Sequence, residues 1–243
     1  MALISAAPAF AATRLIPNIN RDLPLFFEDA RPIGAGNLQF QAVARYERTH
    51  EGTDQYFLLP QVQYGFSPRG FAQLSTTEIL GSEPKSGTSD LTLAGFYSLL
   101  PDLKAPFKLA FYTQLEFPTG PADSGLQNET GLFATQSLDD IEKNEIHLNL
   151  YWIHSTNPGE NELRHRYRAI VGYNNDINEK WIFLADVVRE QGPEWNQFSN
   201  TIEVGAIYAS SEKQNFALGL GAGIGEQSQK FRATIGYQYQ LGD

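Results

Sequence analysis

Apolar and polar residues alternate along the stretch from Phe216 to Leu241, with a break at 226–228. Apolar positions such as Leu218 and Ile235 are separated by glycine, amide and charged residues. A period of two is that of a β-strand, whose successive side chains point to opposite faces. Each half of the stretch is therefore predicted to be a strand with one apolar and one polar face. Each has the roughly 9–11 residues that cross a bilayer at a tilt.

The same period recurs from Gly36 onward and predicts about twelve antiparallel strands, an even number as in bacterial single-chain barrels. The predicted strands are 38–46, 56–64, 71–80, 91–99, 107–117, 129–137, 145–152, 166–173, 181–187, 202–208, 216–224 and 231–241. The third is the least regular, because Glu78 falls among its apolar positions, and the sixth is weakly patterned. Short turns alternate with longer polar loops, which is typical of a transmembrane barrel.

Alternation by itself fits two folds. A soluble β-sandwich or lipocalin-like barrel buries its apolar faces, whereas a membrane barrel turns them to lipid. The strand number favours the second, because about eight strands already suffice to fill an interior with side chains. Aromatic residues near strand ends, such as Tyr64, Trp152 and Trp181, match a membrane interface. The predicted fold class is all-β: an antiparallel up-and-down transmembrane β-barrel with an N-terminal extension.

The amino-acid composition argues against several classes of ligand and partner. The 243 residues include 11 Tyr, 16 Phe and 3 Trp but no Cys, so disulfides and thiolate metal sites are excluded. The histidines lack metal-ligand spacing, and no metal or cofactor is predicted. A formal net charge of −10 argues against nucleic acid, which requires clustered Lys and Arg. No apolar run reaches the roughly 18 residues of a membrane-spanning helix.

The N-terminal part divides into two segments. Residues 1–12 resemble the tail of a secretory signal peptide, since Ala9-Phe-Ala11 fits the small-x-small cleavage pattern, although a flexible chain end is the alternative. Residues 13–35 are aperiodic and contain Pro17, Pro24 and Pro32. They are predicted to be an extension or plug that lies in or against the barrel, with a short helix at 22–30. The barrel is predicted to span 36–243.

Three short motifs resemble a known family. They are Phe26-Phe-Glu-Asp-Ala-Arg-Pro-Ile-Gly-Ala-Gly36, Glu145-Ile-His-Leu-Asn-Leu-Tyr151 and Ile182-Phe-Leu-Ala-Asp-Val187. They are similar to the entry segment, a central strand and a later strand of outer-membrane proteins of the MetA phenol-degradation type. The resemblance implies a Gram-negative outer-membrane channel or transporter, with a hydrophobic or aromatic solute. It implies no catalytic residues.

The polar faces of the predicted strands supply the candidate lumen residues. The basic side chains there would cost about 2–4 kcal/mol each if they faced lipid at the midplane, so the charged residues are predicted to point inward. The candidates are Arg45, Lys108, Glu116, Glu145, His147, Arg166, Arg168, Asp186, Glu203, Lys230 and Arg232. They are predicted either to select solutes or to form ion pairs that cross-link and close the lumen. Glu145 and Asp186 are each expected to pair with Arg166 or Arg168.

A row of glycines, Gly219, Gly221, Gly223 and Gly225, removes side chains from one inward wall. Either a solute path or the N-terminal segment would fill the groove, or the row permits strand curvature and close packing of a neighbour.

The predicted function is a channel or transporter for a small solute in the bacterial outer membrane. The alternative is a structural or complex-forming barrel with a plugged lumen, in contact with lipid and with envelope proteins or further copies of itself. A lipid-modifying enzyme using His154 and Ser155 is disfavoured, because neighbouring strand residues face opposite sides. The chain is therefore not predicted to be an enzyme.

Overall fold

The computed structural model describes residues 18–81, 87–120 and 125–242. The segment 1–12, predicted to be a signal remnant, lies outside these residues. The strands in chain order are β1 (Leu38–Arg48), β2 (Asp54–Ser67), β3 (Gly70–Ser75), β4 (Glu78–Gly81), β5 (Gly87–Thr88), β6 (Leu91–Ser98), β7 (Phe107–Phe117), β8 (Gln127–Ser137), β9 (Asn144–Ser155), β10 (His165–Asp176), β11 (Trp181–Gln191), β12 (Phe198–Ser211), β13 (Gln214–Ile224) and β14 (Phe231–Leu241).

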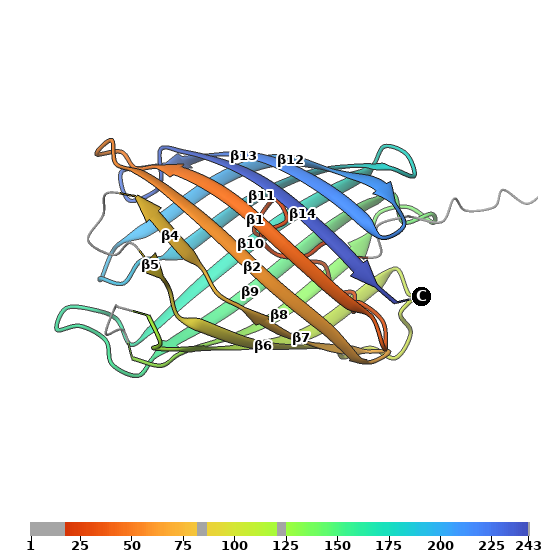
Figure 1. Cartoon of the computed structure of the whole chain (residues 1–243), viewed down its shortest axis with the longest axis horizontal. Coiled ribbons are helices and arrows are strands. Elements are labelled where there is room, and N and C mark those ends of the chain that lie inside the picture. Colours follow the sequence, from red (N-terminus) through yellow and green to blue (C-terminus); the bar gives the residue numbers. More distant parts are fainter. Residues whose placement is uncertain (1–17, 82–86, 121–124, 243) are drawn as a thin grey trace, which may run out of the picture.

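The strands form one antiparallel sheet that closes into a barrel (Figure 1). Closure is between β1 and β14, in register from Leu38 opposite Leu241 to Arg48 opposite Phe231. Both β3 and β4 pair with β2, and the short β5 pairs with β4, so twelve strands make the closed wall. The predicted fold class is confirmed.

The third predicted strand, 71–80, is divided in the structure. Its first part is β3 and its second part is β4, with an interruption at Thr76 and Thr77. Opposite this interruption lies Pro60 of β2, which has no backbone N–H to donate across the ladder. The weakly patterned strand 129–137, by contrast, belongs to the full-length β8.

The outer surface of the barrel is apolar. Leu218 and Ile235, near the middle of β13 and β14, are 59% and 63% exposed. Aromatic side chains, including Trp152, Tyr64 and Trp181, are exposed nearer the strand ends. The predicted orientation, with apolar faces outward, is therefore confirmed. Within the described part of the chain, no helix is both long enough and apolar enough to span a membrane.

The inside of the barrel is not purely polar, contrary to the expectation from alternation. Inward residues such as Phe71, Phe133 and Ile170 are buried together with apolar side chains of the N-terminal segment. Figure 1 shows this segment, in red, inside the wall of the barrel. An apolar interior of this width needs filling, and residues of the segment 18–35 occupy it.

No helix forms at 22–30, and that prediction is wrong. The chain there makes turns and bends, and Asp22 has a left-handed φ of 69°. The backbone N–H groups of Phe26, Glu28 and Ala30 donate to side chains of the barrel wall instead of to carbonyls within a helix. The wall thus satisfies the hydrogen bonds that a helix would have made for itself.

Candidate functional site: the lumen

The N-terminal segment, residues 18–35, forms a loop inside the barrel; we call it the lumen loop. Near its start, Asn20 donates to Gln39 and Gln238, close to the end of the barrel where β1 begins and β14 ends. At its other end, Gly36 N donates to Gly65 O of β2 at 2.8 Å. Since short turns join the strands at this same end, both ends of the lumen loop lie on what is the periplasmic side in bacterial barrels.

The wall holds the backbone of the lumen loop by side-chain acceptors. Asp186 Oδ2 of β11 accepts from Phe26 N at 3.0 Å and from Phe27 N at 3.3 Å. Asn149 Oδ1 of β9 accepts from Glu28 N at 2.8 Å. Asn149 also donates to the Glu28 carbonyl at 2.9 Å, so this amide fixes both backbone groups of one residue.

Arg21 of the lumen loop connects to the wall on the β7–β9 side. Its guanidinium pairs with Glu129 at 2.5 Å and donates to Gln114 at 2.8 Å. It also lies 5.5 Å and 5.7 Å from the ring centres of Tyr112 and Tyr151, within the range of cation–π attraction. Glu129 receives a second cation, since Arg168 of β10 pairs with it at 3.2 Å.

A second charged cluster lies where β1 meets β14. Asp22 pairs with Arg45 at 2.5 Å, and Arg232 pairs with Glu203 at 3.2 Å. The guanidinium carbons of Arg45 and Arg232 lie 5.0 Å and 4.1 Å from the centre of the Phe26 ring. The ring of Phe26 thus contacts two cations of the barrel wall.

A third cluster reaches the short turn between β8 and β9. Arg31 pairs with Asp29 at 3.1 Å, with Glu142 at 3.0 Å and also with Glu145. Lys108 of β7 pairs with the same Glu142 at 3.0 Å. The lumen loop is therefore tied by ion pairs to three separate parts of the wall.

The side chain of Phe27 packs against His147 and Gly172 of the wall. The Phe27 ring stacks on the imidazole of His147, with centroids 4.7 Å apart. His147 contacts Thr135 Oγ1 at 2.9 Å through Nδ1 and Asn174 Oδ1 at 2.7 Å through Nε2, so both ring nitrogens are used. A Cβ atom on Gly172 would lie 2.5 Å from Cγ of Phe27, so only glycine leaves room for this ring.

The predicted glycine row has three different neighbours. A Cβ atom on Gly219 would lie 3.0 Å from Cβ of Pro24 of the lumen loop. The same atom on Gly221 would lie 2.7 Å from Glu203 Oε1, and on Gly223 it would meet the turn at Ser228 and Gln229. Within the row, only the first glycine makes space for the lumen loop.

Some of the predicted lumen residues lie away from the lumen loop. Arg166 donates to Gln127 at 2.8 Å, and Gln127 in turn donates to Glu116 at 3.1 Å, near the long-loop end of the barrel. Lys230 is exposed in the turn before β14 and is not on the inward face. The expected pairing of Glu145 and Asp186 with Arg166 or Arg168 is wrong. Asp186 accepts from backbone N–H groups of the lumen loop, and Glu145 pairs with Arg31 of that loop and also accepts from Ser137 of β8. Strand patterns cannot reveal the contacts with the loop.

An aromatic cluster on the inward face was not singled out from the sequence. Phe71 stacks on Phe96 with centroids 4.8 Å apart, and Tyr112 stacks on Phe133 at 5.2 Å. Tyr151 meets Phe133 edge-on at 5.2 Å and faces Arg21. The sequence does contain a signal for this cluster: Tyr112 and Tyr151 occupy polar-face positions of their strands, which are the positions predicted to point inward.

Glu28 is buried in the lumen loop, and its Oε1 has no hydrogen-bond partner among the described residues. Removal from water raises the pKa of this carboxyl from its ordinary value of 4.5 to about 8, against the opposing effect of Arg21. Nearby Asp29 and Asp22 raise it further. Glu28 is therefore largely protonated at neutral pH.

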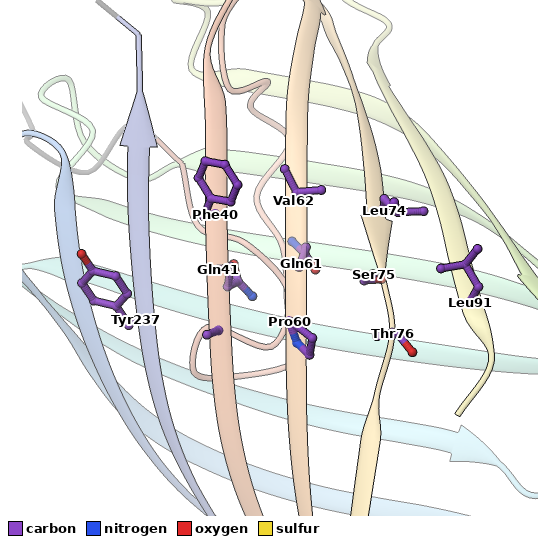
Figure 2. Close-up of a pocket in the computed structure, with 11 residues that line it drawn as sticks. Phe40, Gln41, Pro60, Gln61, Val62, Leu74, Ser75, Thr76, Leu91 and Tyr237 are labelled. Atoms are coloured by element: carbon purple, nitrogen blue, oxygen red, sulfur yellow. The ribbon is translucent and has the colours of Figure 1, made fainter. Parts of the chain in front are cut away.

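A separate hollow of about 370 Å³ lies on the outside of the barrel, across β14, β1, β2, β3 and β6 (Figure 2). Its lining includes the outward side chains of Phe40, Leu74 and Leu91, around Pro60. It faces the lipid side and is not part of the lumen. Among the residues that the structure describes, no three His, Asp or Glu side chains are arranged to hold a metal ion.

Solved outer-membrane barrels resemble this fold. The KdgM porin gives a TM-score of 0.60 at 13% identity, covering 83% of this chain and 99% of its own. The NanC porin gives 0.62 at 10% identity, covering 84% and 100%. An outer-membrane channel from Pseudomonas putida F1 gives 0.67 at 15% identity, covering 88% and 98%. KdgM has also been solved in complex with disordered oligogalacturonate.

No protein-family model matches the chain, and no curated protein matches it. At these identities the similarity establishes the fold, which is that of bacterial outer-membrane porins and channels. The outer membrane is the location that this fold and the apolar outer surface indicate.

Proposed function

We propose that the protein is an outer-membrane channel for a small solute, closed at rest by the lumen loop. The observation that carries the proposal is that a separate, non-strand segment fills a twelve-stranded barrel. Because the segment is bound by side-chain contacts and is not a strand of the wall, it can move without breaking the sheet. A barrel of this size without the segment has room for a water-filled path.

The aromatic cluster supports a hydrophobic or aromatic solute, in agreement with the resemblance to the phenol-degradation type. Phe71, Phe96, Tyr112, Phe133 and Tyr151 offer ring faces along one inward wall, next to Arg21. A planar ring would stack on these faces in place of the side chains that now cover them. Part of the lumen loop must move to expose them, since all five side chains are buried.

The ion-pair clusters favour a second candidate, a permanently closed structural barrel. Arg21, Asp22 and Arg31 each pair with a different part of the wall, and all of these pairs must separate before the whole loop can leave. If all three stay formed in every state, the barrel conducts nothing. The channel proposal requires instead that at least part of the loop opens.

Planar-bilayer conductance separates these candidates. We expect the full chain to show low or intermittent conductance, and a variant lacking residues 13–35 to show a larger and steadier current. Aromatic and aliphatic acids of similar size, added on one side, test the solute class, with the aromatic acid expected to block the current more strongly. No current from either form, with heat-modifiable migration proving that both are folded, would defeat the channel proposal.

A further inference from the structure

Two histidines face each other on the outside of the barrel, away from the lumen. His154 of β9 and His165 of β10 are directly opposite in the strand register. Their rings are stacked with centroids 4.8 Å apart, and the two Nδ1 atoms are 3.3 Å apart. The chain has four histidines in all. One of the others, His147, has both ring nitrogens engaged in the lumen, and His50 is in the β1–β2 loop.

The pair lies at the edge of the apolar outer surface. Two positions further toward the middle of the barrel, on the same face, Trp152 of β9 is opposite Tyr167 of β10, and both are exposed. Exposed Trp and Tyr occupy the membrane–water interface in membrane barrels. The step from aromatic rings to imidazoles therefore places the histidines at headgroup level, where water and dissolved ions reach them.

The spacing of the two nitrogens suits one metal ion. Two Zn–N bonds of about 2.0–2.1 Å to nitrogens 3.3 Å apart enclose an angle of about 107°, close to the tetrahedral value of about 109°. Because the rings are stacked with an interplanar angle of 28°, both side chains must rotate to direct their Nδ1 lone pairs at one ion. A square-planar Cu²⁺ site would need an angle of about 90° and nitrogens about 2.9 Å apart. Hard ions such as Mg²⁺ and Ca²⁺ prefer oxygen ligands.

The neighbouring indole fixes one of the rings. Trp152 Nε1–H donates to His165 Nδ1 at 3.2 Å, so the lone pair of that nitrogen is directed at the indole. A metal ion bound there would replace both the indole contact and the contact with His154. The indole would then report on the occupancy of the site.

From this geometry we propose that His154 and His165 form a two-imidazole site for Zn²⁺ on the outer face of the barrel, completed by water. The ion would bridge β9 and β10 beside the 156–164 loop. The site is independent of solute passage, because neither side chain faces the lumen.

Calorimetry with ZnCl₂ on the full chain in detergent, without a polyhistidine tag, tests the proposal. We expect one Zn²⁺ per chain. His154→Ala and His165→Ala should each weaken binding about tenfold or more, since one imidazole remains. His50→Ala is the matched control and should bind as the original chain does. Heat-modifiable migration shows that each variant is folded.

Co²⁺ supplies a second readout. In a chain with Trp181→Phe and Trp195→Phe, Trp152 is the only tryptophan. Co²⁺ binding should quench the tryptophan fluorescence together with the appearance of tetrahedral Co²⁺ absorption bands. His165→Ala should shift both signals to Co²⁺ concentrations about tenfold higher or more. No Zn²⁺ binding by the folded chain, or equal binding by the variant lacking both His154 and His165, overturns the site.

Discussion

Arg21 and Glu129 form an ion pair of 2.5 Å inside the barrel although they are 108 positions apart in the sequence. Glu129 is 3% exposed and also pairs with Arg168, so one buried carboxylate balances two guanidinium groups from different segments. This carboxylate is therefore the main electrostatic link between the lumen loop and the wall on this side.

Glu129→Gln is expected to release the lumen loop. Removing one partner of a buried pair costs about 3–5 kcal/mol, because the remaining charge is left uncompensated. Hydrogen–deuterium exchange of peptides covering 18–35 should rise, and conductance should increase. Glu190→Gln is the matched control, since Glu190 pairs with Arg168 and is more exposed. Equal exchange in the two variants would contradict the assigned role of Glu129.

Gly172→Ala is expected to displace Phe27. The added methyl group would lie 2.5 Å from Cγ of the ring, whereas a methyl group on Gly95 of β6 would meet nothing within 4 Å. Conductance and protease accessibility of the lumen loop should therefore rise for Gly172→Ala and stay unchanged for Gly95→Ala. Phe27→Ala removes the ring that the added methyl group would meet. Gly172→Ala should therefore lower the free energy of unfolding in urea in the original chain but not in a chain that already carries Phe27→Ala.

The docking of the lumen loop is expected to weaken as the pH rises from about 4.5 to about 8. Burial raises the pKa of Glu28 to about 8 when the loop is docked, so the docked form holds a proton that the released form loses. The stabilisation is complete below the ordinary pKa and is lost as the pH approaches the raised one.

Glu28→Gln has no proton to lose and should flatten this dependence. The measurement is hydrogen–deuterium exchange of 18–35 across the pH range, corrected for the intrinsic rate. A pH dependence that is the same in Glu28→Gln would show that another group is responsible.

Leu218→Arg is expected to destabilise the barrel in lipid. The side chain is 59% exposed near the middle of β13, and an arginine at the bilayer midplane costs about 2–4 kcal/mol. Leu138→Arg, in a short turn where the side chain is 55% exposed, should cost little. Urea unfolding in lipid vesicles compares the two. Similar costs for both variants would contradict the position of the membrane.

The strands and their orientation were predictable from the sequence for a local reason. Side chains of a strand point alternately to its two faces, so the outward position of Leu218 and the inward position of Arg232 follow from each strand alone. The division of strand 71–80 was not predictable in the same way. It depends on Pro60, a residue of the neighbouring strand whose missing N–H matters only once the two are paired.

The candidate lumen residues were found by the same local rule, but their partners were not. Arg45 and Arg232 contact Phe26, and Glu145 contacts Arg31, because the lumen loop lies between them. The aperiodic segment carries no signal of which wall it will touch. The aromatic cluster was missed because an aromatic residue at a polar position of the alternating pattern looks like an irregularity of the strand and not like part of a site.

The sequence by itself determined the number of strands, their apolar and polar faces, and the presence of an irregular segment before them. All three follow from the spacing of residue types along a single chain. Only the tertiary structure decided that this segment folds back inside the barrel, that Glu129 and Asp186 hold it, and that Gly172 makes room for Phe27. Those contacts join residues more than 100 positions apart, and they exist only after closure of β1 on β14 has created an interior to fill.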